Sequence, residues 1–167
     1  MKRQAWLLVL LLAVAPLAWA GADAVTTVTQ AKALMRTGPA GQPQARVLFE
    51  TAAGQGSGAA AYYLGLMLKN GIGGAQDGAA ASRWLELAAQ RQVAPAMFIL
   101  ANMLLAGDEA RARFWLDAAC DADYPEALLQ KSVALSEGRM GYAHHEAQAA
   151  LFLKMAEHAM GHRQPEP

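Results

Sequence analysis

The chain has 167 residues with 14 basic and 14 acidic side chains, and this neutral balance argues against nucleic-acid binding, which needs a basic footprint. Alanine and leucine fill 61 positions, whereas valine, isoleucine and threonine fill only 14, so the composition predicts an all-α fold rather than a sheet. The single cysteine excludes an internal disulfide, a cysteine-only zinc site and a CxxC redox motif.

Residues 1–20 are predicted to be a secretory signal peptide. A short basic start precedes an unbroken apolar run over residues 5–15, and Ala18 and Ala20 place small residues at the −3 and −1 positions of a cleavage site. The run is shorter than the roughly 20 apolar residues that a membrane span needs. We therefore expect cleavage after Ala20, a periplasmic location and no stable membrane insertion of the mature chain. An uncleaved membrane anchor is the alternative.

The mature chain is predicted to begin with a capping helix and a linker over residues 21–43, the helix itself covering residues 24–36. A glycine- and proline-rich stretch then leads into a repeat domain over residues 44–160, and a disordered tail over residues 161–167 follows. Seven helices are expected in the repeat domain, over residues 44–55, 58–70, 78–91, 94–106, 108–121, 125–138 and 144–160.

Two unlike helical motifs alternate along the repeat domain. The first is twelve residues long, starts with alanine and begins at Ala60, Ala96 and Ala127, which are 36 and 31 residues apart. It ends with glycine at residues 71, 107 and 138, and this glycine suits the left-handed conformation that ends a helix. The second places a large apolar residue four positions before a small one. Its large residues, at intervals of 36, 30 and 38, are Leu48, Trp84, Phe114 and Phe152. Unlike helices that alternate at a period near 35 predict stacked helix–turn–helix units.

The spacing within the first motif predicts how these helices pack. Positions 1, 5, 6 and 9 fall on one side of a helix, so Leu64 and Leu100 at position 5 are expected in the core. Small residues at position 6, namely Gly65, Ala101 and Ser132, let the neighbouring helix approach closely. The large residue of the second motif is expected to fill the gap between layers.

The pattern resembles Sel-1-like repeats, relatives of the tetratricopeptide repeat. The residues that carry this resemblance are Ala52-Ala53-Gly54-Gln55-Gly56, Ala60 to Met67 with Leu64-Gly65, and Asn70-Gly71-Ile72-Gly73. The resemblance covers about residues 44–159 and implies a right-handed α-solenoid of about three units with an N-terminal capping helix. It also implies a non-catalytic interaction module that needs no cofactor and binds a protein or peptide partner. Two departures are Lys131 at an expected leucine and a shortened loop at residues 106–108.

The partner-binding residues are predicted on the concave face, which the first helix of each pair lines in tetratricopeptide-like solenoids. Positions 4 and 7 of the first motif point away from its core seam, and stacking would align them in two rows that suit a peptide. These positions are Tyr63, Leu66, Ile99, Asn102, Gln130 and Val133. Burial against a neighbouring layer is the competing interpretation for each of them.

Other chemistry has weaker support in the sequence. His158 and His162 have the i, i+4 spacing of a two-histidine metal site, so the alternative function is an exported enzyme or a ligand- or metal-binding protein that uses the C-terminal histidines. Solvent-exposed histidines without a metal are the simpler interpretation. Cys120 is expected to be buried, with an intermolecular disulfide as its alternative. Residues 71–74 are rich in glycine but lack the strand and the Lys-Ser/Thr pair of a phosphate-binding loop.

Overall fold

The computed structural model describes residues 17–162, with side chains from residue 23 onward. This part of the chain is all-α, as predicted, and contains no strand. Its helices are α1 (Leu17–Arg36), α2 (Gln42–Gly54), α3 (Gly58–Asn70), α4 (Gly78–Gln90), α5 (Ala94–Leu104), α6 (Glu109–Asp121), α7 (Pro125–Glu137) and α8 (Glu146–Gly161). None of these helices is long and apolar enough to cross a membrane.

The predicted helices of the repeat domain are confirmed, each end lying within two residues of its expected position. The first helix differs, because α1 begins at Leu17 rather than at residue 24. Residues 17–24 are rich in alanine, which favours helix, and contain no proline that would end the helix. At the other end α8 continues to Gly161, the first residue of the predicted tail. Residues 1–16 of the predicted signal peptide and residues 163–167 of the tail lie outside the described residues.

Local side chains account for most helix ends. Ser57, Asp77 and Asp108 act as N-caps, and their side-chain oxygens accept hydrogen bonds from backbone N–H groups three residues later at 3.1, 2.8 and 3.0 Å. At the C-terminal ends, Gly71 and Gly138 adopt left-handed φ angles of +65° and +64°. These two glycines close the first motif as predicted.

For the third glycine, Gly107, the prediction of a helix cap is wrong. α5 ends at Leu104, three residues earlier, and Leu105 follows in a right-handed conformation. The backbone N–H groups of Gly107 and Asp108 both donate to the carbonyl of Leu104, at 3.0 and 2.8 Å. The shortened loop therefore turns directly into the N-cap of α6 and leaves no room for a separate glycine cap.

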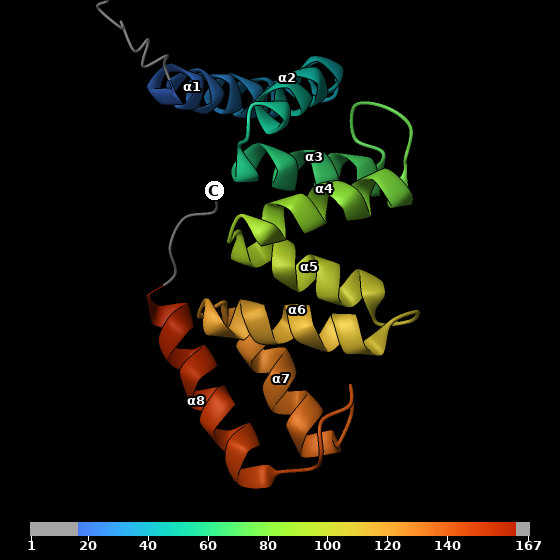
Figure 1. Cartoon of the computed structure of the whole chain (residues 1–167), viewed down its shortest axis with the longest axis vertical. Coiled ribbons are helices and arrows are strands. Elements are labelled where there is room, and N and C mark those ends of the chain that lie inside the picture. Colours follow the sequence, from blue (N-terminus) through green and yellow to red (C-terminus); the bar gives the residue numbers. More distant parts are fainter. Residues whose placement is uncertain (1–16, 163–167) are drawn as a thin grey trace, which may run out of the picture.

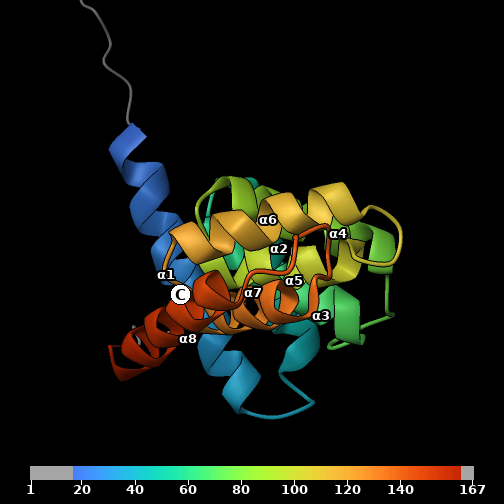
Figure 2. The same ribbon diagram turned by 90° about the horizontal axis from the view of Figure 1, so that it is seen from below.

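The helices form a stack of consecutive pairs (Figure 1). Each odd-numbered helix packs most extensively along the even-numbered helix that follows it, and the predicted capping helix α1 pairs in this way with α2. Seen from below, α4 and α6 lie toward one side of the stack, and α3 and α7 toward the other (Figure 2). The described residues thus form an all-α solenoid of four helix pairs.

The small residues at position 6 allow close packing within each pair, as predicted. A Cβ atom added to Gly65 of α3 would lie 2.7 Å from Cγ of Leu85 on α4. At the same position in α7, Ser132 donates a hydrogen bond from Oγ to the backbone oxygen of Ala149 on α8, at 2.7 Å. Leu64 and Leu100 are buried, which confirms their place in the core.

The predicted register of the second motif is wrong, by one residue in α2 and α4 and by two residues in α6. The fully buried large side chains are Phe49, Leu85 and Leu116, whereas Phe114, expected to fill the gap between layers, is 62% exposed. Burial of residues 81, 85, 88 and 89 in α4 recurs at residues 112, 116, 119 and 120 in α6. This offset of 31 equals that between Ala96 and Ala127, so Cys120 occupies an alanine position.

Lys131, the departure at position 5, is held in a polar cluster between α6, α7 and the α7–α8 loop. Its Nζ lies 2.6 Å from Oδ1 of Asp117, and the Tyr142 hydroxyl donates to the same oxygen at 2.7 Å. The ammonium also lies 4.4 Å from the centre of the Phe152 ring. Burial and the bond to Asp117 raise the pKa of Tyr142, so its hydroxyl keeps the proton that it donates.

Arginines at one repeat position tether the two long interhelical loops. Arg46 of α2 donates from Nη1 to the carbonyl of Ala75 in the α3–α4 loop at 3.1 Å, and Arg113 of α6 donates likewise to Gly141 in the α7–α8 loop at 2.7 Å. The same position in α4 holds Ser82, and the α5–α6 loop that follows is the short one. In this chain, each long loop is therefore accompanied by a tethering arginine on the preceding helix pair.

Candidate partner-binding surfaces

The first predicted binding residue, Tyr63 on α3, takes part in packing. Its ring stacks on Phe49 of α2 with centroids 5.1 Å apart and planes 18° apart. Nζ of Lys32 on α1 lies 4.7 Å from the centre of the same ring. Leu66 and Ile99 are also half-buried against the core. At these three positions the structure shows the burial that was the competing interpretation, and a partner would reach only part of each side chain.

The remaining predicted residues lie on α5 and α7, where Asn102 and Val133 are exposed and Gln130 is half-buried. Nε2 of Gln130 donates to Oδ1 of Asn102 at 3.0 Å, and Nδ2 of Asn102 donates to the carbonyl of Phe98 at 2.9 Å. Val133, one turn along α7, is 45% exposed. The structure therefore brings predicted residues of successive units into contact, as the alignment of rows requires. Whether they bind a partner stays a prediction.

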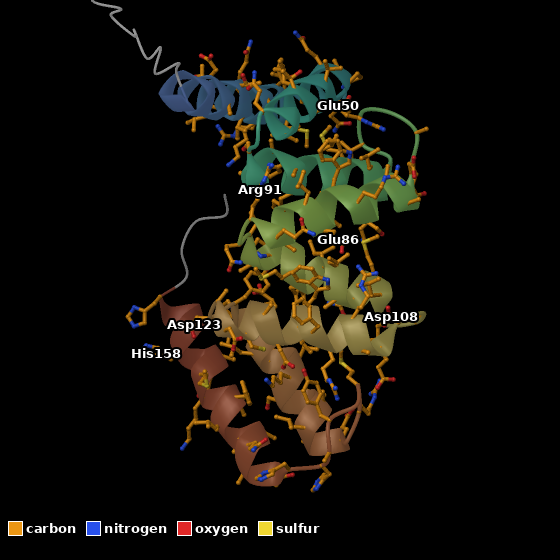
Figure 3. All side chains as sticks on the ribbon, in the orientation of Figure 1. Glu50, Glu86, Arg91, Asp108, Asp123 and His158 are labelled. Atoms are coloured by element: carbon orange, nitrogen blue, oxygen red, sulfur yellow. The ribbon has the colours of Figure 1, made fainter. Side chains whose placement is uncertain are left out.

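A second surface, on α4 and α6, was missed by the sequence analysis. A shallow cavity of about 520 Å³ is lined by Arg83, Trp84, Glu86, Leu87 and Gln90, all on α4. Glu86 is labelled on α4 in Figure 3. An ion pair of 2.7 Å from Nη2 of Arg111 to Oε1 of Glu86 connects this surface to α6.

The exposed ring of Phe114 continues this surface on α6, where it lies edge-on to Trp115 with centroids 5.0 Å apart. Exposed arginine and aromatic side chains are enriched where proteins bind each other. The corrected register provides the signal that was overlooked, since Val47, Arg83, Phe114 and Leu151 share one exposed repeat position.

The C-terminal histidines are brought together, but with little support for a metal site. The rings of His158 and His162 have centroids 4.7 Å apart, and His158 lies on the outer side of α8 (Figure 3). His145, by contrast, caps α8, with Nδ1 accepting from the backbone N–H of Gln148 at 3.2 Å. Within the part of the chain that the structure describes, no three His, Cys, Asp or Glu side chains are grouped so that they could hold a metal ion.

Cys120 is buried, which confirms the expectation for this residue. Burial raises the pKa of its thiol from 9.0 to about 12, and the nearby Lys131 only partly offsets this effect. At neutral pH the sulfur is therefore a protonated thiol rather than a nucleophilic thiolate. Its burial also leaves it without access to a cysteine of another chain.

Comparison with known proteins gives a structural likeness but no sequence match. No protein family model matches the chain, and no curated protein matches it in sequence. The crystal structure of a Sel1 repeat protein from Oxalobacter formigenes is similar over 87% of this chain and 61% of that chain, with a TM-score of 0.74 and 19% identity. A protective antigen of uropathogenic Escherichia coli strains, displaying an SLR fold, matches over 83% of this chain and 38% of that chain, with a TM-score of 0.45 and 20% identity. This chain therefore spans less than two thirds of either protein.

Proposed function

We propose, from the Sel1 repeat fold that this chain shares with the Oxalobacter formigenes protein, that it is a non-catalytic periplasmic scaffold for a protein or peptide partner. Stacked repeats expose equivalent side chains of successive units along one extended surface. The observation that carries the proposal is the hydrogen bond of 3.0 Å between Gln130 and Asn102, which joins position 4 of the first motif in α7 to position 7 of the same motif in α5. A partner segment lying across both units would contact them together.

Export through a cleavable signal peptide is part of this proposal. The buried side chains that the structure describes on α1 are Ala24, Val28 and Ala31, all of which follow the predicted cleavage site after Ala20. Cleavage there would leave these three packed side chains in place. Mass spectrometry of the N-terminal peptide from native protein tests this step. A peptide beginning at Gly21 is expected, and a retained Met1 would contradict it.

The two candidate surfaces call for matched variants at exposed positions. Replacement of Tyr63 would disturb its stacking on Phe49, so loss of binding there would be hard to separate from loss of folding. Asn102 and Val133 are exposed and test the predicted concave residues. Arg83 and Phe114 are exposed in the same way and test the surface on α4 and α6.

The experiment compares two double variants, Asn102→Lys with Val133→Lys and Arg83→Glu with Phe114→Lys. Each is crosslinked in the periplasm, and circular dichroism checks that its melting curve is retained. Loss of the native crosslinked partner in the first variant alone would support the predicted concave residues. Loss in the second alone would place the interface on α4 and α6. Partner capture that survives in both variants would contradict binding on either surface.

One observation favours the alternative of a metal-binding protein, namely the closeness of the rings of His158 and His162. Two imidazoles one helical turn apart can hold one metal ion if a third ligand comes from elsewhere. Metal analysis of the purified mature protein separates this alternative from the scaffold. Stoichiometric metal that His158→Ala abolishes would favour the metal-binding protein, and its absence would favour the scaffold.

A further inference from the structure

Exposed apolar side chains concentrate on the last helix pair. The structure describes eight large hydrophobic residues that are exposed, and five of them lie on α7 or α8. These five, between 41% and 55% exposed, are Leu129, Val133, Leu151, Leu153 and Met160. Apolar side chains gathered in this way on one part of a surface indicate an interaction site, whereas single ones need no explanation.

Comparison between repeats shows why these residues are uncovered. Leu153 of α8 occupies the repeat position of Leu85 in α4 and Leu116 in α6, both of which are completely buried. Leu129 of α7 occupies the position of Tyr62 in α3, which is only 3% exposed. In the inner pairs the next pair lies over this side, but no described helix follows α8 at the lower end of the stack (Figure 1).

A solenoid end that faces water normally carries polar residues on its outer side. Here the uncovered side of α7 and α8 keeps the apolar residues of an inner repeat. We call this side, defined by Leu129, Leu153 and Met160 together with the adjoining exposed side of α8, the end face.

The charges on the exposed side of α8 are self-complementary. Lys154 and Glu157 are both exposed, lie about one turn apart, and form no ion pair with any described residue. A two-fold axis can pass between two antiparallel α8 helices, perpendicular to them and level with the midpoint between Met155 and Ala156. Lys154 of one copy then lies opposite Glu157 of the other, and the reverse pair forms by symmetry.

The same axis matches two further exposed residues of α8. Ala150 of one copy comes opposite Gly161 of the other, and both residues are small enough to let the two backbones approach. One two-fold axis therefore pairs charge with charge and small with small.

We propose that two copies of this chain associate through the end face, with their α8 helices antiparallel and Lys154 of each paired with Glu157 of the other. Self-association would bury the apolar residues that a following repeat would otherwise cover. Opposite charges fix the register, because any shift along α8 separates them. The solenoid surfaces of the two copies would then point away from a shared centre.

Sedimentation equilibrium of the mature chain tests this proposal. A reversible dimer is expected, and Lys154→Glu or Glu157→Lys alone should weaken it about tenfold or more, because each change places like charges opposite one another. An equimolar mixture of the two variants should recover the dimer, since both cross pairs are then restored with reversed sign. Circular dichroism establishes that each variant is folded.

Phe114→Asp is the matched control, an exposed apolar residue outside the end face, and should leave the dimer unchanged. Leu153→Asp should weaken the dimer because it puts a charge on the apolar part of the face. A monomer at all concentrations would overturn the proposal, leaving the face for a different protein. A dimer that resists both charge reversals would overturn it too, as would a mixture of variants that stays monomeric.

Discussion

The second and fourth helix pairs are equivalent units of the repeat, but different chemistry holds each of them together. In α3 and α4, position 5 of the first motif is the buried Leu64, and Gly65 beside it leaves room for Leu85. This pair depends on apolar surface and shape. Its cohesion comes from removing side chains from water and from a fit that tolerates no added atom.

In α7 and α8 the same two positions are polar. Lys131 replaces the leucine and reaches Asp117 of α6, and Ser132 replaces the glycine and donates to Ala149 of α8. Position 6 of the first motif thus faces the second helix of the pair in both units, although the residue type there differs. It follows that the second pair should be sensitive to volume, and the fourth to the loss of polar partners.

Leu64→Ala should have the largest effect in this comparison. Removing a fully buried leucine loses its burial and leaves a cavity, at a cost of about 2–5 kcal/mol in the free energy of unfolding. Chemical denaturation monitored by circular dichroism measures this, and Leu100→Ala in the third pair should behave alike. An effect within experimental error would show that position 5 does not support the core.

Gly65→Ala should destabilise the second pair through overcrowding. The added methyl group would lie 2.7 Å from Cγ of Leu85, which forces α3 and α4 apart at a cost of about 1–3 kcal/mol. Adding Leu85→Ala to Gly65→Ala should remove the clash, so the two changes together should cost less than their sum. Strict additivity in denaturant titrations would mean that the contact is not limiting.

Lys131→Leu tests the difference between the two pairs directly, because it gives the fourth pair the apolar residue that the second pair has at the same position. We expect a loss of about 1–2 kcal/mol, since Asp117 keeps Tyr142 but loses its cation. Combining it with Asp117→Asn should recover part of that loss. Arg111→Leu, which breaks the exposed pair with Glu86, serves as the control and should cost below about 1 kcal/mol. Equal costs for Lys131→Leu and Arg111→Leu would contradict a special role for the cluster.

Cys120→Ala should have the smallest effect at neutral pH, about 1 kcal/mol or less, because alanine occupies the equivalent positions 53 and 89. At alkaline pH the substitution should change the stability more strongly. The thiol of the unfolded chain loses its proton near pH 9.0, whereas the folded one keeps it to about 12, so the folded state loses stability as the pH rises between these values. Denaturation curves at several pH values should show this component in the native chain and not in the alanine variant.

The helix boundaries could be predicted because their causes are local. Ser57 and Asp77 as N-caps and Gly71 as a left-handed C-cap act within one turn of the chain. The register of α6 could not be fixed in this way, because Phe114, Trp115 and Leu116 are consecutive large apolar residues. Which of them is buried depends on the neighbouring helices.

The candidate surfaces also differ in how far the sequence could predict them. Contact between α5 and α7 followed from the repeat period, and the bond from Gln130 to Asn102 bears it out. The stacking of Tyr63 on Phe49 depends on the angle between α2 and α3, which no spacing in the sequence encodes. The cluster of Asp117, Lys131 and Tyr142 joins three separate segments, so no local pattern could reveal it.

The arginine tethers have a consequence for how the length of this solenoid's loops can change. Arg46 and Arg113 each hold a loop that belongs to the following helix pair, so a loop and its anchor lie on different units. A long loop transplanted between α5 and α6 would reach a surface where Ser82 offers no guanidinium to its carbonyl groups. A long loop and the arginine that tethers it therefore form one structural unit across two helix pairs, and a graft of the loop without Ser82→Arg would transfer only half of that unit.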